Sequence, residues 1–315
     1  MALLFLLSSW SRDEWTQAMR RQGPDIDIRV WPDEMGNIED ITYAVAWLPP
    51  PHVLESLPNL KMIFSLGAGV DAILNDPTLP EGVPIARVAE PDLTMRMTEY
   101  VVMQVLMHHR QQRRFEENQR NRIWDCFPTH SASALAVGIM GLGVLGSDAA
   151  QKLASLGFKV AGWSRSRKTI SGIECFAGSD EFDSFLKRTD ILVCLLPHTP
   201  ETTGLINGEV IAKLSRKGPF GAPILINAGR GKQQVESDIL AALDSGALYA
   251  ATLDVFETEP LPQDSPFWSH PKVTLTPHAA ADSDPDTITA YVLHQIRRHQ
   301  TGLPVENIID RKRGY

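Results

Sequence analysis

Cysteine is scarce in this chain: Cys126, Cys175 and Cys194 are the three in 315 residues, and none belongs to a CxxC pair. Such spacing suggests neither a zinc site nor a disulfide framework, and a buried structural thiol is favoured over a reactive one. An excess of positive charge is also lacking, because 30 Lys and Arg against 38 Asp and Glu give a formal charge of −8. No general attraction therefore draws the chain toward nucleic acid or anionic lipid, and an anionic ligand needs a local basic site.

Long hydrophobic runs are missing as well. The apolar residues 1–7 are too short to span a bilayer and lack a basic flank and a cleavage site, so they predict a buried first strand. We therefore expect a cytoplasmic protein without a membrane partner. A chain of this length can bury roughly 70–75% of its unfolded surface, which excludes a disordered chain. At ~100–200 residues per domain, two domains are expected.

Short apolar runs alternate with longer mixed stretches, which is typical of βαβ units around a parallel sheet. The expected strands are residues 3–7, 26–30, 43–46, 62–64 and 85–88, then 134–140, 159–163, 191–195, 224–227, 250–254 and 273–275. The expected helices are residues 12–22 with Ser11 as N-cap, one long connecting helix over about 94–119, then 145–156, 234–245 and about 285–298. The pattern predicts an α/β fold.

A glycine pattern follows the strand that ends at residue 140. Gly141, Gly143 and Gly146 form GxGxxG, and Val144 and Leu145 open a helical pattern. In a dinucleotide site the first glycine permits the tight turn, the second lets the backbone approach a pyrophosphate, and the third lets helix and strand pack closely. The helix N-terminus then favours phosphate. A bare GxGxxG is weak evidence, but here strand, loop and helix agree.

The next strand ends in a basic turn of Ser164, Arg165, Ser166 and Arg167, with no acidic residue. An NAD site would place Asp or Glu there to bind the adenosine ribose. An acid would repel a 2′-phosphate, whereas two arginines and a serine can hold one through charge-assisted bonds. The turn therefore predicts NADP(H), preferred over NAD(H); an ordinary solvated basic turn is the alternative.

Three more segments follow predicted strands, at the edge where open parallel sheets bind ligands. They contain Arg230 (residues 226–231), Glu259 (253–260) and His278 (276–281). With the glycine loop they resemble the D-isomer specific 2-hydroxyacid dehydrogenase family over almost the whole chain, and within it the A-type glyoxylate/hydroxypyruvate reductases. Residues 47–50, 67–71, 164–168 and 310–315 support the resemblance.

The resemblance implies a role for each of these side chains. Arg230 would bind the substrate carboxylate and polarise the adjacent keto oxygen. His278 would act as general acid and base, because imidazole titrates near neutral pH, and Glu259 would hydrogen-bond it and fix its tautomer. Asp254 would lie near the nicotinamide carboxamide. Each assignment has an alternative. Glu259 and Asp254 could be solvated loop carboxylates, Arg230 could be a surface residue, and His278 could be structural.

Further residues are assigned by the same resemblance. The implied substrate-binding residues are Trp47, Gly67, Ala68, Gly69 and Val70, the last four as an anion nest of backbone N–H groups. The implied additional cofactor contacts are Leu196, Pro197 and Ala228. Trp124 is expected either to reach a neighbouring subunit's pocket or, like Trp47, to pack in the core. Two features depart from the family pattern, His198, which receives no catalytic role, and the bends of residues 217–223.

The resulting expectation is a pair of doubly wound parallel-sheet domains. Residues 94–284 would form a Rossmann domain for NADP(H), and residues 1–93 with 285–315 a smaller, flavodoxin-like substrate domain, with the substrate in a cleft between them. The implied activity is NADPH-dependent reduction of glyoxylate to glycolate and of hydroxypyruvate to D-glycerate, without a metal, in a homodimer formed through the cofactor domain. A dehydrogenase for a larger 2-ketoacid, or a non-catalytic NADP-sensing corepressor-like protein, are the alternatives.

Overall fold

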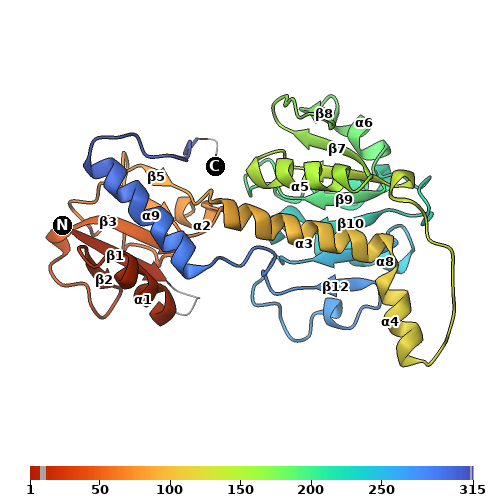
Figure 1. Ribbon diagram of the computed structural model, residues 1–315, viewed down its shortest axis with the longest axis horizontal. Helices are drawn as coiled ribbons and strands as arrows, with labels where there is room; N and C mark the ends of the chain where they lie inside the picture. Colours follow the sequence, from red (N-terminus) through yellow and green to blue (C-terminus); the bar gives the residue numbers. More distant parts are fainter. Residues whose placement is uncertain (8–11, 313, 315) are drawn as a thin grey trace. The chain divides into compact units, whose positions relative to one another are not determined.

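The structure, a computed structural model, describes residues 1–7, 12–312 and 314. The chain forms two compact units: unit 1 comprises Met1–Leu93 and Ser283–Tyr315, and unit 2 comprises Thr94–Asp282 (Figure 1). The expected N-cap Ser11 lies outside the described residues, as do Arg313 and Tyr315 of the final segment.

Unit 1 is built on a parallel sheet. Within its described residues the sheet has five strands in the order β2-β1-β3-β4-β5. Their bounds are β1 Ala2–Leu7, β2 Asp27–Val30, β3 Ile41–Trp47, β4 Met62–Ser65 and β5 Ile85–Ala86. This order is that of flavodoxin-like folds, and it confirms the predicted fold class. Every side chain of β1 is buried, which explains its unbroken apolar sequence.

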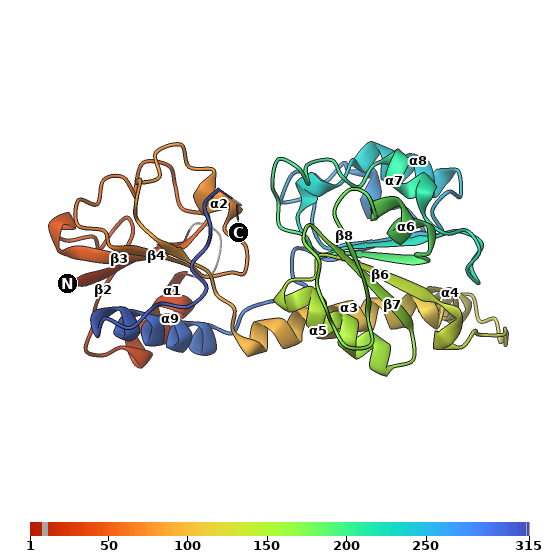
Figure 2. The same cartoon turned by 90° about the horizontal axis from the view of Figure 1, so that it is seen from above.

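Two helices from opposite ends of the chain pack together in unit 1. Helix α1 (Arg12–Gln22) lies beside α9 (Pro285–Gln300) on the same face of the sheet (Figures 1 and 2). Arg21 and Asp286 join the two helices through an ion pair of 2.8 Å. Helix α9 begins where the sequence predicts, because Asp284 caps the N–H of Thr287. A short helix α2 (Asp71–Leu74) completes the unit.

Unit 2, all of whose residues are described, has a seven-stranded parallel sheet in the order β12-β11-β10-β9-β6-β7-β8. The strands are β6 Ala136–Met140, β7 Lys159–Ser164, β8 Glu174–Ala177, β9 Ile191–Cys194, β10 Ile224–Asn227, β11 Ala250–Leu253 and β12 Val273–Leu275. The order reverses between β9 and β6, as in Rossmann folds. Strand β8 was not predicted, because none of its side chains is fully buried and it lacks an apolar run.

Helices cover both faces of the unit 2 sheet. Figure 2 shows α6, α7 and α8 on one face and α3 and α5 on the other. The helices are α3 Pro91–His109, α4 Gln112–Arg120, α5 Val144–Ser155, α6 Phe182–Lys187, α7 Gly208–Lys213 and α8 Glu236–Asp244. Short 3₁₀ turns lie at Ile38–Asp40, Ala132–Ala134, Gly231–Gln233 and Pro266–Trp268. Along β10, Leu225 faces one core and Ile224 and Ile226 the other, which accounts for its continuous apolar sequence.

The prediction of one long helix over residues 94–119 is wrong. Helix α3 ends at His109 and α4 begins at Gln112, because Gln111 adopts a left-handed conformation with φ 54°. A right-handed helix cannot continue through such a residue. The new direction is held by Arg113, whose guanidinium donates to Thr274 Oγ1 at 3.2 Å. Among the described helices, none is both long and apolar enough to cross a membrane.

We expect Gly146→Ala to destabilise the protein. A Cβ at Gly146 would lie 1.8 Å from the carbonyl oxygen of Gly141, so strand β6, the turn and α5 could not keep their spacing. The free energy of unfolding should fall by about 1–3 kcal/mol in thermal or urea unfolding without ligand, although alanine favours helices. Gly143→Ala is the matched control, because a Cβ there has no atom within 4 Å and φ is −76°. Equal stabilities of the two variants would contradict this explanation.

Candidate active site

The candidate side chains of unit 2 gather at the carboxyl edge of its sheet. All its strands are parallel, so the loops that follow β6, β9, β10, β11 and β12 leave from one edge. These loops contain the glycine pattern, Arg230, Glu259 and His278. The edge includes the reversal of strand order between β6 and β9, where open α/β sheets form their ligand crevice.

His278 and Glu259 form a hydrogen-bonded pair. His278 Nδ1 lies 2.7 Å from Glu259 Oε2, and the other carboxylate oxygen accepts the N–H of Phe256 at 2.9 Å. Burial by itself would raise the pKa of Glu259, but the bonds from His278 and Phe256 and the charge of Arg230 lower it overall. A carboxylate can only accept, so Nδ1 carries the hydrogen. Nε2 is then the ring nitrogen that can exchange a proton.

The backbone of His278 is strained. Its φ is +54°, a left-handed conformation that costs roughly 1–2 kcal/mol for a residue with a side chain. Such residues persist where the surroundings impose them, and they concentrate at functional sites. The His278 N–H donates to the carbonyl oxygen of Asp254 at 2.8 Å, which ties this turn to the end of β11.

Arg230 lies half-buried in the loop after β10. Its backbone N–H donates to Gln233 Oε1 at 2.9 Å, and its guanidinium donates to the Gly229 carbonyl at 2.8 Å. A Cβ on the next residue, Gly231, would lie 1.8 Å from the carbonyl oxygen of Phe256. This glycine therefore lets the arginine loop press against the loop that leads to Glu259, and the charge of Arg230 reaches that carboxylate.

Buried amide side chains, which no sequence motif marked as site residues, join these loops. Asn227, Gln233 and Gln234 are at most 2% exposed. Gln233 Nε2 donates to the carbonyls of Leu196 (2.7 Å) and Pro197 (2.9 Å), two predicted cofactor contacts. Asn227 Nδ2 donates to Gln234 Oε1 at 2.9 Å. An amide at the end of an otherwise apolar strand, followed by two glutamines, is the signal that could have revealed this network.

The glycine loop fits a diphosphate group. Gly141 has φ +106°, and a Cβ there would lie 2.8 Å from the carbonyl oxygen of Leu195, so the turn after β6 passes close to the loop after β9. Gly143 is the N-cap of α5, makes no side-chain capping bond, and has open space where a Cβ would be. The first N–H groups of α5, beginning with the exposed Val144, are therefore uncapped by a side chain, as phosphate binding requires.

The basic turn after β7 is exposed, with Arg167 already bonded within the protein. Ser164 Oγ donates to the carbonyl of Ser166 at 2.8 Å. Arg167 donates to the Cys175 carbonyl at 2.7 Å and forms an ion pair with Glu181. The N–H of Ala177 and then Arg167 lower the pKa of Glu181, which keeps that pair charged. The predicted role of this turn toward a 2′-phosphate stays a prediction.

The predicted substrate residues of unit 1 meet at the carboxyl edge of its own sheet. Trp47 ends β3, and its ring packs on Gly67 after β4, so closely that a Cβ on Gly67 would lie 2.3 Å from Trp47 Cζ3. Ser65 Oγ donates to the Gly69 carbonyl at 2.8 Å, which shapes the loop. Val70 is buried and precedes α2. The loop is thus a compact turn on one face of a tryptophan.

Other predicted residues are placed as follows. Leu196 and Ala228 are nearly buried in the loops after β9 and β10. His198 Nε2 lies 3.0 Å from Thr203 Oγ1, within hydrogen-bonding distance. Trp124 follows α4 and is 102% exposed, so the alternative that it packs in the core is wrong. Among the described residues, no cluster of His, Cys, Asp or Glu could hold a metal.

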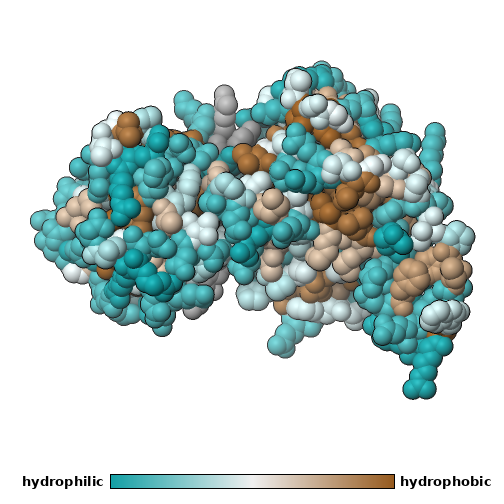
Figure 3. Space-filling model, viewed as in Figure 1, coloured by the Kyte–Doolittle hydropathy of each residue, from teal (hydrophilic) through white to brown (hydrophobic). Residues whose placement is uncertain are grey.

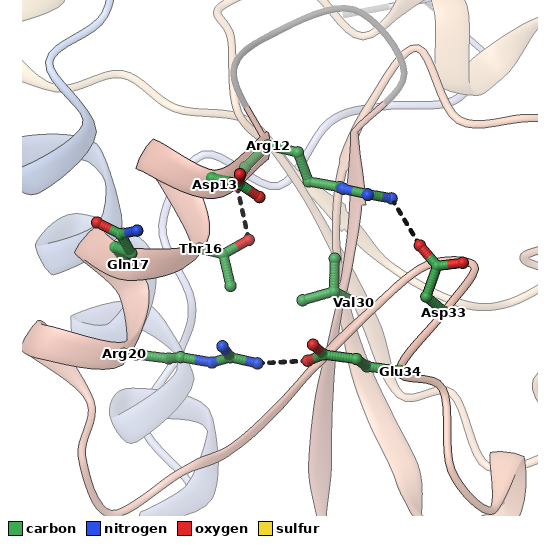
Figure 4. A pocket seen from close by; sticks show the side chains of 8 residues that line it. All are labelled: Arg12, Asp13, Thr16, Gln17, Arg20, Val30, Asp33 and Glu34. Carbon is green, nitrogen blue, oxygen red and sulfur yellow. Dashed lines mark hydrogen bonds and ion pairs between the residues drawn. The ribbon is translucent and has the colours of Figure 1, made fainter.

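A small pocket of about 120 Å³ lies elsewhere in unit 1, between α1 and the end of β2 (Figure 4). Two ion pairs, Arg12 with Asp33 and Arg20 with Glu34, line it. Because these opposite charges already pair with one another, the pocket is a weaker candidate than the sheet edges.

Comparison with known proteins agrees with the fold. The family model for the NAD binding domain of D-isomer specific 2-hydroxyacid dehydrogenases matches residues 102–280. Glyoxylate/hydroxypyruvate reductase A of Yersinia enterocolitica is 38% identical in an alignment 320 positions long that covers 100% of both chains.

Solved structures match over the same extent. The NADPH-dependent glyoxylate/hydroxypyruvate reductase of Sinorhizobium meliloti, solved with NADP and sulfate, is 46% identical with a TM-score of 0.95, covering 100% of both chains. A D-isomer specific 2-hydroxyacid dehydrogenase of Xanthobacter autotrophicus, solved with NADPH and MES, is 40% identical with a TM-score of 0.93, covering 100% of this chain and 99% of that one. The chain therefore belongs to the D-isomer specific 2-hydroxyacid dehydrogenase family, whose members are oxidoreductases.

Proposed function

We propose that this enzyme reduces small 2-ketoacids with NADPH, converting glyoxylate to glycolate and hydroxypyruvate to D-glycerate. The 2.7 Å bond between His278 Nδ1 and Glu259 Oε2 is the observation that carries the proposal, because it equips one imidazole for proton transfer. Similarity to reductases named for these substrates, and to structures that hold NADP or NADPH, supports the choice of substrate and cofactor.

The proposed reaction gives a distinct task to each of three side chains, those of Arg230, His278 and Glu259. Arg230 binds the substrate carboxylate and polarises the keto oxygen. Before the reaction the His278 ring is protonated on both nitrogens, and Glu259 stabilises this imidazolium. His278 then donates its Nε2 proton to the keto oxygen, which becomes the hydroxyl of the product. When bound, NADPH supplies the hydride that the keto carbon receives. In the reverse direction His278 accepts the hydroxyl proton.

The remaining assignments concern binding. The glycine loop and the first turn of α5 would hold the cofactor diphosphate, the turn at residues 164–167 the 2′-phosphate, and Asp254 would lie near the carboxamide. Trp47 and the N–H groups of residues 67–70 would bind the small substrate. Substrate binding is assigned to residues 1–93 and 285–315, and cofactor binding to residues 94–284. We further propose a cytoplasmic homodimer formed through the cofactor domain.

The proposal is tested by following NADPH oxidation with glyoxylate, hydroxypyruvate and phenylpyruvate as parallel substrates. The two small acids should be reduced with the higher kcat/KM. A clear preference for phenylpyruvate would indicate the alternative of a larger substrate pocket. Tight NADPH binding with no oxidation by any of the three would indicate a non-catalytic sensor.

Replacing Arg230 by lysine should lower kcat/KM for glyoxylate by about 10²–10³-fold. Lysine keeps the charge but loses the planar fork that binds a carboxylate through two parallel bonds. Steady-state kinetics at saturating NADPH measure the effect. Arg216→Lys, at an exposed position after α7, is the control and should match the unsubstituted enzyme. Near-normal kcat/KM in Arg230→Lys would remove this residue from the mechanism.

Arg165→Ala should lower kcat/KM for NADPH by about 10–100-fold, because one charge-assisted hydrogen bond is lost. The variant should leave kcat/KM for NADH nearly unchanged. Only the 2′-phosphate distinguishes the two cofactors, so the ratio of the two constants isolates the contact. Lys159→Ala removes a cation from the opposite end of the same strand, β7, and should not change the ratio. A ratio that stays constant in Arg165→Ala would place the 2′-phosphate elsewhere.

Trp124→Glu should convert the dimer to a monomer. No side chain of the fully described helix α4 is buried, and the following Ile123 and Trp124 are 53% and 102% exposed. Figure 3 shows hydrophobic side chains at the surface around this end of unit 2. Light scattering should give twice 34.9 kDa for the unsubstituted protein and 34.9 kDa for the variant. Trp268→Glu, at another exposed tryptophan, should stay dimeric; a dimeric Trp124→Glu would contradict this interface.

A further inference from the structure

A chain of hydrogen bonds leads from helix α3 to the turn that carries His278. The hydroxyl of Tyr100, which is 7% exposed, lies 2.8 Å from Thr276 Oγ1. Thr276 Oγ1 in turn lies 2.6 Å from Asp254 Oδ1. A carboxylate cannot donate, so the single hydroxyl hydrogen of Thr276 points to Asp254. The Tyr100 hydroxyl must therefore donate to Thr276, and the direction of the whole chain is fixed.

Asp254 holds the backbone of His278 and of the two residues that follow it. Its side chain accepts the N–H of Ala279 at Oδ1 (2.8 Å) and the N–H of Ala280 at Oδ2 (3.1 Å). Its carbonyl oxygen accepts the N–H of His278 itself at 2.8 Å. With Thr276 bonded to Oδ1, the turn is wrapped around one carboxylate that is 1% exposed. Both carboxylate oxygens are thus occupied inside the protein.

This arrangement explains how His278 keeps a conformation that it would not adopt alone. At φ +54° the residue persists only if neighbouring bonds over-determine its backbone. A turn that relaxes would rotate the imidazole away from Glu259 Oε2, the acceptor that fixes its tautomer. A misplacement of about 1 Å at a reacting group can cost about 10²-fold in rate.

Tyr100 is suited to act as a permanent donor. Burial raises the pKa of its hydroxyl, and the nearby charge of Asp254 adds to this effect. The phenol therefore keeps its proton across the range in which the enzyme works. The Tyr100 hydroxyl is therefore the first donor in the series of hydrogen bonds that ends at the turn of His278.

We propose that Tyr100 and Thr276 are positioning residues for proton transfer, and that they act through Asp254 to hold the His278 turn. The proposal rests on the function proposed for His278 above. The proposal also gives Asp254 a task, that of linking Thr276 to the His278 turn by hydrogen bonds, which needs no contact with a ligand.

A second polar contact on the same helix provides a matched control. Gln104 and His108 follow Tyr100 at four-residue intervals on α3, and both reach Thr252 of β11. Burial lowers the pKa of His108 to about 4, so this contact is uncharged. Like the Tyr100–Thr276 contact, it joins α3 to a threonine hydroxyl, although it is more deeply buried, and among the described residues none of its bonds leads to the His278 turn.

The test compares Tyr100→Phe, Thr276→Val, Thr276→Ser and Thr252→Val. Thr276→Val, which keeps the shape but removes both bonds, should lower kcat by about 10–100-fold and leave the Kd for NADPH within about twofold. Tyr100→Phe should lower kcat by about twofold to tenfold. Thr276→Ser, which retains the hydroxyl, should restore kcat. Thr252→Val should lose thermal stability and keep kcat, because it breaks a buried contact that does not reach the turn.

Two outcomes would overturn the inference: wild-type kcat in both Thr276→Val and Tyr100→Phe, or an equal fall of kcat in Thr252→Val, which would make the effect one of general stability. A His278→Gln variant separates this inference from the proposed function. If His278→Gln is inactive while Thr276→Val and Tyr100→Phe are fully active, only the positioning role fails. If His278→Gln is fully active, the proposed function itself fails.

Discussion

The shared carboxyl edge of the parallel sheet in unit 2 is the constraint on which the candidate site depends. Parallel strands deliver their following loops to one edge, and small residues let those loops touch. Gly231 admits the carbonyl of Phe256, and Gly146 admits that of Gly141. Without the approach at Gly231, Arg230 would not lie close enough to Glu259 for its charge to lower the pKa of that carboxyl. The positions of the charged side chains at the site therefore depend on close packing of the backbone.

Buried polar groups then fix the loops in register. Gln233 uses its amide to join the arginine loop to the carbonyls of Leu196 and Pro197. Asp254 does the same for the turn of His278. A loop movement that left one of these buried amides or carboxylates without a hydrogen-bond partner would raise the free energy of the folded state. Few alternative loop arrangements are therefore allowed. Specific geometry at this edge is therefore a consequence of hydrogen-bond satisfaction as much as of apolar burial.

Sequence patterns predicted what depends on local order. Apolar runs such as 224–227 marked the central strands, because a strand buried on both faces is apolar throughout. The GxGxxG loop was found because its glycines, strand and helix are contiguous. The break at Gln111 escaped prediction, since contacts with distant residues, such as that of Arg113 with Thr274, decide it. Strand β8 escaped prediction because it is only partly buried and lacks an apolar run.

By itself, the sequence determined the α/β class, the family motifs and the identity of Arg230, Glu259 and His278 as a candidate set. Only the tertiary structure decided that His278 Nδ1 meets Glu259 and that Tyr100 reaches the same turn through Thr276 and Asp254. Tyr100 and Thr276 are 176 positions apart in the chain. Hydrogen bonds over such separations exist only after the sheet and α3 have packed, so no local pattern can reveal them.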